Sequence, residues 1–214
     1  MINKEALDKI HRNVPPDYYQ SGIKHNYLQR YWHHRRFAVI SRELKKLNLS
    51  APLLDLGCHG GDLTNVLSQA AQVDIYGIDI SEKSIEFAKR RFPNINFSVQ
   101  DFPGQKQFTD NYFQAITAFD VTEHIPDTPK VLDEIKRLLK PGGYFIMAIP
   151  NENLLFKVVW LFWTSFKGQV WEGVHVHDFK MEGFAEFEKQ GFEKIVELKI
   201  IFGMWWFLIF RVKK

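Results

Sequence analysis

The chain is poor in cysteine, and Cys58 is the only one among its 214 residues. A single cysteine excludes a disulfide within the chain and favours a reducing compartment. The first nine residues include Lys4, Glu5 and Asp8 and contain no apolar run, so they do not resemble a secretory signal peptide. We therefore expect an intracellular, cytoplasmic protein.

A strong charge imbalance is also absent. The formal net charge is +3, which permits an anionic partner but is slight for a protein that binds a phosphate backbone. Hydrophobic residues make up 45% and charged residues 25% of the chain, a balance typical of globular proteins. The length suffices for a substantial core. We expect a helical segment over residues 1–50 and a main domain over residues 51–214.

One glycine-rich stretch, LLDLGCHGGDLT at residues 53–64, organises the rest of the chain. Its apolar start ends in Asp55. The glycines that follow are Gly57, Gly60 and Gly61, after which helical spacing resumes, so the pattern predicts a strand, a tight turn and a helix N-terminus. Loop glycines let backbone N–H groups approach a ligand, and a helix N-terminus favours an anionic group. We expect Asp55 to pair with an amine-bearing part of that ligand.

Acids also mark the ends of the next three apolar stretches. The stretch over residues 75–80 contains Asp79, and the following two end at Asp101 and Asp120. In a doubly wound fold, an acid at the tip of the second strand binds ribose hydroxyls. Asp101 is followed by Phe102, a pair that suits the amine and the ring face of a purine. Helical patterns between the stretches predict a parallel sheet with its ligand at the carboxyl ends of the strands.

Capping and turn-forming residues predict where several helices and strands begin or end. Ser81 is a suitable N-cap for the helix that follows the second strand. The segment KPGG at residues 140–143 should end a later helix, so that the fifth strand covers residues 144–149. Two last strands over residues 192–201 and 206–212 are joined by a short turn, which makes them antiparallel.

Together these motifs resemble those of class I S-adenosylmethionine (SAM)-dependent methyltransferases, of the group that includes the ubiquinone and menaquinone biosynthesis methyltransferases. The resemblance covers about residues 50–151, with His59 in place of the middle loop glycine. The motifs that carry it are DxGxxxG at 55–61, Asp79, QDF at 100–102, EHI at 123–125 and LKPGG at 139–143. It implies SAM as cofactor and a Rossmann-like α/β fold, with a seven-stranded, mostly parallel sheet, helices on both faces and an antiparallel last strand.

The resemblance and the strand-end positions together predict the cofactor site. The residues expected to line it are Asp55, Gly57, Cys58, His59, Gly61, Asp79, Ile80, Asp101, Phe102, Phe119 and Asp120. In related methyltransferases a leading helical segment folds over the cofactor, which adds Tyr19, Arg30 and Tyr31 as lid residues. Arg30 belongs to the basic face of a helix over residues 26–47, and the alternative is that this face is only solvated.

Methyl transfer mainly requires alignment and exclusion of water, because a sulfonium methyl is already activated. A hydroxyl acceptor also needs a base, and histidine suits that role. We expect His124, which follows the fourth strand, to be this base, with His175 and His177 as the next candidates. The alternative for His124 is a helix cap or a core hydrogen bond.

Metal-binding alternatives exist for the same histidines. One uses His175 and His177 with Asp178, but no further well-spaced histidine or cysteine lies nearby. The other resembles quinone O-methyltransferases with a Glu-x-x-Glu-His-Val pattern, in which an acid at Asp120 and the Glu123–His124 pair would hold a divalent ion. We expect no metal.

Residues 154–166 are apolar almost throughout, and Lys157 is their one charged residue. Thirteen residues are too few to span a bilayer, which takes about 20. They form either a buried or lid helix, or a surface that contacts a membrane interface or a lipid tail. Both alternatives belong to an apolar helical insertion over about 152–180 and predict an acceptor with a hydrophobic portion.

We therefore expect a SAM-dependent methyltransferase that acts on a small or lipid-linked acceptor by O- or C-methylation. One alternative is an RNA-modifying methyltransferase, based on the basic, aromatic residues 24–46 and the RVKK tail at 211–214, although we do not expect a nucleic-acid partner. Another is a non-catalytic binding or scaffold protein. A nicotinamide enzyme is disfavoured, because the loop lacks the G-x-G-x-x-G pattern.

Overall fold

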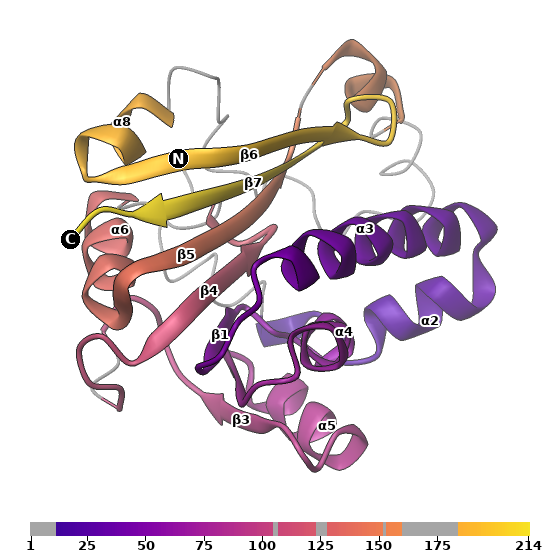
Figure 1. Ribbon diagram of the computed structural model, residues 1–214. Helices are drawn as coiled ribbons and strands as arrows, with labels where there is room; N and C mark the ends of the chain where they lie inside the picture. Colours follow the sequence, from indigo (N-terminus) through magenta and orange to yellow (C-terminus); the bar gives the residue numbers. More distant parts are fainter. Residues whose placement is uncertain (1–11, 105–106, 123–127, 152, 160–183) are drawn as a thin grey trace.

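The computed structural model describes residues 12–104, 107–122, 128–151, 153–159 and 184–214 (Figure 1). Its centre is a seven-stranded sheet with the strand order β3-β2-β1-β4-β5-β7-β6. Strands β1 to β5 pair in parallel, and β7 runs antiparallel to both β5 and β6. The predicted Rossmann-like sheet with a reversed last strand is thus confirmed. The strands are β1 (Leu53–Leu56), β2 (Ile75–Asp79), β3 (Asn96–Val99), β4 (Phe113–Phe119), β5 (Leu139–Pro150), β6 (Phe192–Ile200) and β7 (Trp205–Val212).

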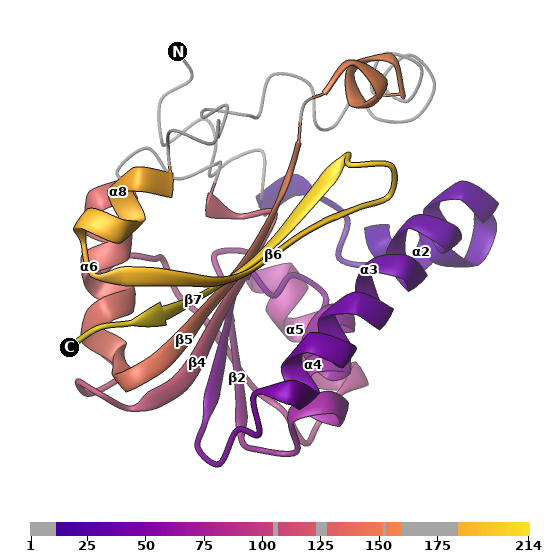
Figure 2. The same cartoon turned by 45° about the horizontal axis from the view of Figure 1, so that its top comes forward.

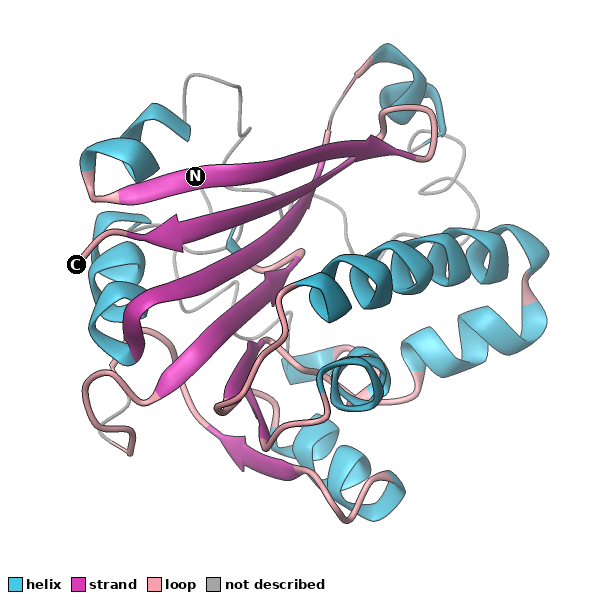
Figure 3. Cartoon of the chain, viewed as in Figure 1, coloured by secondary structure: helices cyan, strands magenta, loops and turns pink. Residues whose placement is uncertain are grey.

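Helices cover both faces of this sheet (Figure 3). They are α2 (Tyr18–His25), α3 (Tyr27–Lys46), α4 (Asp62–Ala71), α5 (Glu82–Arg91), α6 (Thr128–Leu138) and α8 (Phe184–Lys189). On one face α3 and α4 bury Ile40, Leu44 and Leu67 against the sheet. On the other, α6 and α8 bury Leu132 and Phe187. Figure 2 shows the two helical layers on opposite sides of the strands.

The predicted helix starts follow from capping. Asn26 precedes α3, and its side-chain oxygen accepts from the backbone N–H groups of Leu28 and Gln29 at 2.9 and 3.1 Å. Ser81 caps α5, as predicted, by accepting from the N–H of Ser84. Each cap satisfies donors that have no partner within the helix. The caps therefore fix where α3 and α5 begin.

The prediction for the start of the fifth strand was wrong by five residues. α6 ends at Leu138, and β5 begins at once with Leu139, which is fully buried and pairs with Phe113. The register then shifts before Ala115 pairs with Tyr144. The KPGG segment is thus an irregularity inside β5, because burial of Leu139 holds the chain in the sheet on its N-terminal side.

The carboxyl ends of the parallel strands β1 to β5 lie at the same edge of the sheet. Asp79 is at the end of β2, and Asp120 directly follows β4 at this edge.

The predicted insertion over 152–180 lies mostly outside the described residues, apart from a helical stretch over 154–159. No helix in the described part of the chain has both the length and the apolar character to cross a membrane.

Candidate active site

The loop between β1 and α4 is held tightly on two sides. The N–H groups of Gly57 and Cys58 both donate to the carbonyl of Ile78 in β2, at 2.9 and 3.0 Å. A Cβ on Gly60 would lie only 2.4 Å from the carbonyl oxygen of Pro16, in the segment before α2. Gly57 has φ of 68° and would likewise meet Val121. Side chains at Gly57 and Gly60 would therefore collide with their surroundings, which explains the glycines.

His59, which stands where the family's middle glycine would be, is tied to the tip of β2. Its backbone takes φ of 46°, and its N–H donates to Oδ2 of Asp79 at 2.9 Å. The other oxygen of Asp79 accepts from the N–H of Ser81 at 2.8 Å. Asp79 thus joins the loop to the start of α5. Cys58 belongs to the same loop, and its side chain packs with Ile85, Ala88 and Phe97. Burial raises the pKa of its thiol well above the ordinary value.

The carboxylate of Asp55, in β1, is hydrogen-bonded within the protein. Its side chain is buried, and its two oxygens accept from the hydroxyls of Thr64 and Thr117, each at 2.7 Å. Burial raises the pKa of Asp55 to about 6. The carboxylate therefore connects β1, α4 and β4, and its predicted pairing with an amine-bearing ligand stays a prediction.

A second polar cluster at the strand ends is formed by Arg36, Asp120 and Trp205. Asp120 directly follows β4 with φ of 55°, and its carboxylate pairs with the guanidinium of Arg36 from α3. Trp205 Nε1 donates to the same carboxylate at 3.0 Å, and the guanidinium carbon of Arg36 lies 4.3 Å from the Trp205 ring centre. Arg36 is 7% exposed, and its Nε–H is buried with no hydrogen-bond partner in the described part of the chain.

Arg36 and Trp205 are site residues that sequence reasoning missed. A signal for Arg36 was present, because it is four residues before Ile40 and three before Val39 and so shares the buried stripe of α3. Arg30, the predicted cation, is exposed and donates to the backbone carbonyls of Ile23 and Lys24 at the end of α2.

Tyr19 forms the contact between the N-terminal segment and the loop. Its ring meets His59 and His33 edge-on, with centroids 5.1 and 5.5 Å apart. Burial of the hydroxyl, together with the charge of Asp120, raises the pKa of Tyr19 far above its ordinary range. Burial and the neighbouring charge of Arg36 lower the pKa of His33 to about 3, so His33 stays neutral. The predicted lid residue Tyr19 thus lies against the loop, whereas Tyr31 is exposed.

The remaining predicted residues differ in burial, and some lie outside the described residues. Phe119 is buried and stacks on Phe207, Ile80 and Phe102 are half-buried, and Asp101 is exposed. His124, His175 and His177 lie outside the described residues. In the ranges that are described, no group of three or more histidine, cysteine or acidic side chains could hold a metal ion.

These residues fit SAM in their chemistry. The tight glycine loop offers backbone approach, Asp79 supplies a carboxylate at the tip of the second strand, and Arg36 supplies a buried cation with an unused N–H. A ligand with ribose hydroxyls and a carboxylate matches these groups.

Comparison with known proteins agrees with this fit. A family model described as a methyltransferase domain matches residues 28–196, which is most of the chain. The ubiquinone biosynthesis O-methyltransferase of Bordetella avium is 30% identical over 114 residues, covering 50% of this chain and 47% of that protein. Its counterpart in Coxiella burnetii (strain Dugway 5J108-111) is 32% identical over 105 residues, covering 47% and 44%. The match spans less than half of the length of these relatives.

Solved structures show the same fold. The PH0226 protein of Pyrococcus horikoshii OT3 has a TM-score of 0.71 at 24% identity, covering 95% of this chain and 98% of that one. A SAM-dependent methyltransferase of Aquifex aeolicus has a TM-score of 0.63 at 15% identity, covering 99% and 100%. With the family match over most of its length and the loop, strand tips and sheet order described above, this chain belongs to the class I SAM-dependent methyltransferases.

Proposed function

We propose that this methyltransferase acts on an oxygen atom of a small or lipid-linked acceptor with a hydrophobic portion. The observation that carries the proposal is the similarity, over about half of the chain, to proteins named ubiquinone biosynthesis O-methyltransferase. The surroundings of the strand ends support it. A helical stretch with exposed Leu154 and Val158 follows the carboxyl end of β5 and places apolar side chains after that strand end.

Three elements would hold the cofactor. Asp79 would accept the ribose hydroxyls, and the loop of Gly57 to Gly61 would offer its backbone. Arg36 would bind the carboxylate of SAM, because a guanidinium presents several N–H donors and the Nε–H of Arg36 is unused among the described residues. We assign this role to Arg36 and not to Arg30, because N–H groups of Arg30 already donate to backbone carbonyls at the end of α2. Tyr19 would cover the site from the loop side.

Ile80, Asp101 and Phe102 would surround the adenosine, by the resemblance stated above. When bound, SAM supplies an electrophilic methyl group, so the protein's task is to orient the acceptor and keep water out.

His124, four positions after Asp120 in the sequence, would take the proton of the acceptor hydroxyl, with His175 and His177 as the other candidates. His33 does not suit this task despite its position, because its pKa of about 3 makes it a poor base.

The test compares phenols that carry a hydrophobic tail with the same phenols without one, using radiolabelled SAM and the full chain. The proposal predicts label on the phenolic oxygen and a higher kcat/KM for the tailed phenol, by about tenfold or more for several buried methylenes. Label on a ring carbon would contradict the O-methylation, and equal kcat/KM values would contradict the hydrophobic portion.

A further inference from the structure

Large apolar side chains are exposed on three segments that are distant in sequence. These are the start of α3, the helical stretch 154–159 and the turn between β6 and β7. Leu154 is 80% exposed, Phe202 in the turn is 78% exposed and Leu28 in α3 is 77% exposed. Tyr27 and Val158 add to the same set. Most of the large apolar side chains that are exposed in the described residues lie on these segments, and we call them together the apolar face.

The three segments are joined to one another. Asn151, just before the helical stretch, donates its backbone N–H to the carbonyl of Met204 at 2.9 Å and its side-chain amide to the carbonyl of Gly203 at 2.7 Å. Phe156 and Met204 belong to one buried cluster, and Trp32 of α3 packs against that cluster. Figure 2 shows the helical stretch, in orange, and the β6–β7 turn, in yellow, on the same side of the molecule as α3. The apolar face is therefore one surface.

The turn presents Phe202 at a conformational cost. Ile201 and Phe202 take φ of 53° and 57°, a region that bulky and β-branched residues rarely adopt. Folding of the core gains nothing from the Phe202 ring, because that ring is exposed. A partner that covers the ring would explain why a large apolar residue occupies this position.

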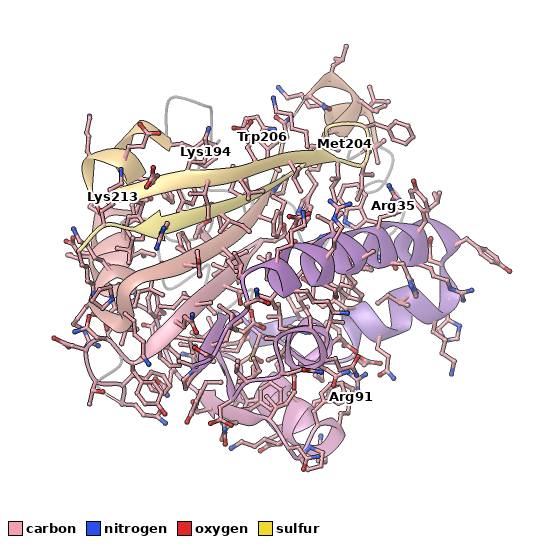
Figure 4. All side chains as sticks on the ribbon, in the orientation of Figure 1. Arg35, Arg91, Lys194, Met204, Trp206 and Lys213 are labelled. Carbon is pink, nitrogen blue, oxygen red and sulfur yellow. The ribbon has the colours of Figure 1, made fainter. Side chains whose placement is uncertain are left out.

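The charged residues within the three segments that form the apolar face are all basic. Residues 18–42 contain no acid, nor do residues 153–159 or 199–205. The exposed cations of these segments include Arg35, Lys157 and Lys199. In Figure 4, Arg35 lies on the side of α3 drawn toward the turn that holds Met204. A positive rim around exposed aliphatic and aromatic side chains matches the surface of a bilayer that contains anionic lipids.

We propose that the apolar face docks onto an anionic phospholipid bilayer. The cations would contact lipid headgroups, while Leu28, Leu154 and Phe202 enter the boundary between headgroups and acyl chains. This inference rests on the proposed function in one respect: docking would bring the carboxyl edge of the sheet to a lipid-linked acceptor in the bilayer. It extends the predicted contact through residues 154–166 to α3 and to the β6–β7 turn.

The test is co-sedimentation of the full chain with vesicles, in the absence of SAM and acceptor. We expect binding to phosphatidylcholine vesicles that contain phosphatidylglycerol, and much weaker binding to phosphatidylcholine alone. The double variant Leu154→Ser/Phe202→Ser should bind at least about tenfold more weakly, because two apolar side chains lose their burial. Val99→Ser is the matched control, since Val99 is 48% exposed on β3, at the opposite edge of the sheet, and should bind like the wild type.

A second pair of variants tests the charges. Arg35→Gln/Lys157→Gln should weaken binding to the anionic vesicles by about tenfold, whereas Lys89→Gln on α5 should not. No sedimentation of the wild type with anionic vesicles, or equal binding by the Leu154→Ser/Phe202→Ser variant, would overturn the proposal. Concentration-dependent dimers that this variant abolishes, without vesicle binding, would instead assign the face to a second copy of the chain.

Failure of this inference and failure of the proposed function give different results. Methyl transfer to a phenol without vesicle binding would overturn only the docking surface. Vesicle binding without methyl transfer would overturn only the acceptor assignment. Thermal melts followed by circular dichroism establish that every variant is folded, which the exposure of the substituted side chains predicts.

Discussion

Arg36 in α3 and Asp120 at the end of β4 form an ion pair across 84 residues of sequence. Trp205 completes this contact by stacking on the guanidinium and donating to the carboxylate. The pair attaches the N-terminal helices to the carboxyl edge of the sheet, where the family binds its cofactor. Stability and cofactor binding should therefore depend on the same residue.

Arg36→Gln should impair both properties. It leaves the partly buried Asp120 without its cation, which should cost roughly 3 kcal/mol of the free energy of unfolding. It should also weaken SAM binding by more than about tenfold, because a charge-assisted contact to the SAM carboxylate is lost. Urea denaturation and calorimetric titration measure the two effects. Arg30→Gln is the matched control, and a loss of SAM affinity in that variant alone would return the carboxylate role to Arg30.

Asp55 should make stability depend on pH in the direction opposite to an ordinary carboxylate. Its pKa rises from 3.8 to about 6 on folding, so the folded protein holds a proton that the unfolded chain releases. The stability that this group contributes is then complete below about pH 4 and is lost as the pH rises to about 6, by roughly 3 kcal/mol for two pKa units.

Asp55→Asn should remove this dependence while keeping hydrogen bonds to Thr64 and Thr117, because its amide oxygen accepts from one hydroxyl and its NH2 group donates to the other. Denaturation series at pH 4, 5, 6 and 7 should therefore show a smaller loss of stability across this interval in the variant than in the wild type. Parallel curves for the two proteins would mean that Asp55 is ionised in the folded state across the whole range.

Gly60→Ala should disturb the contact between the loop and the N-terminal segment. The new Cβ would lie 2.4 Å from a backbone oxygen of Pro16, which cannot move alone, and we expect a loss of about 1–3 kcal/mol in stability. At Gly22 the obstructing atom is the far end of the Gln29 side chain, which is flexible. Gly22→Ala in α2 should therefore be neutral or stabilising by up to about 1 kcal/mol. Equal destabilisation of both variants would show that the Pro16 contact is not the cause.

Tyr19 should act through its ring and not through its hydroxyl. Tyr19→Ser removes the edge-on contacts with His59 and His33 and should weaken SAM binding by about tenfold. Tyr19→Phe keeps the ring and should bind SAM like the wild type. Its raised pKa keeps the wild-type hydroxyl protonated, so the Tyr19 side chain should add no pH dependence to SAM affinity between pH 7 and 9. Calorimetry at both pH values checks this, and a weak Tyr19→Phe variant would assign the binding to the hydroxyl.

Most of the fold could be predicted because its signals are local. Apolar runs that end in acids located β1, β2 and β4, and capping chemistry located the start of α5 at Ser81. The start of β5 was misplaced, because the pairing of Leu139 with Phe113 is a long-range contact that overrides the turn propensity of KPGG.

The site was predictable in position but less so in detail. Asp79 is at the expected strand tip. One hydrogen-bond partner of Asp55 is Thr117, which is 62 residues away, and such a long-range contact could not be predicted from local sequence. Arg36 was missed because a cation on a basic helix is usually solvated, and only the packing of α3 against Trp205 reveals that it is buried. The roles of His124, His175 and His177 stay predictions.

The central claim is that SAM binds at the tip of β2 beside the glycine loop. Calorimetric titration of the full chain with SAM, with NAD as the control ligand, tests it most directly when Asp79→Asn is titrated in parallel. We predict binding of SAM and not of NAD, and an affinity at least about tenfold lower in Asp79→Asn, because the ribose hydroxyls lose a charged acceptor. Folded wild-type protein that does not bind SAM, or an Asp79→Asn variant with unchanged affinity, would contradict the claim.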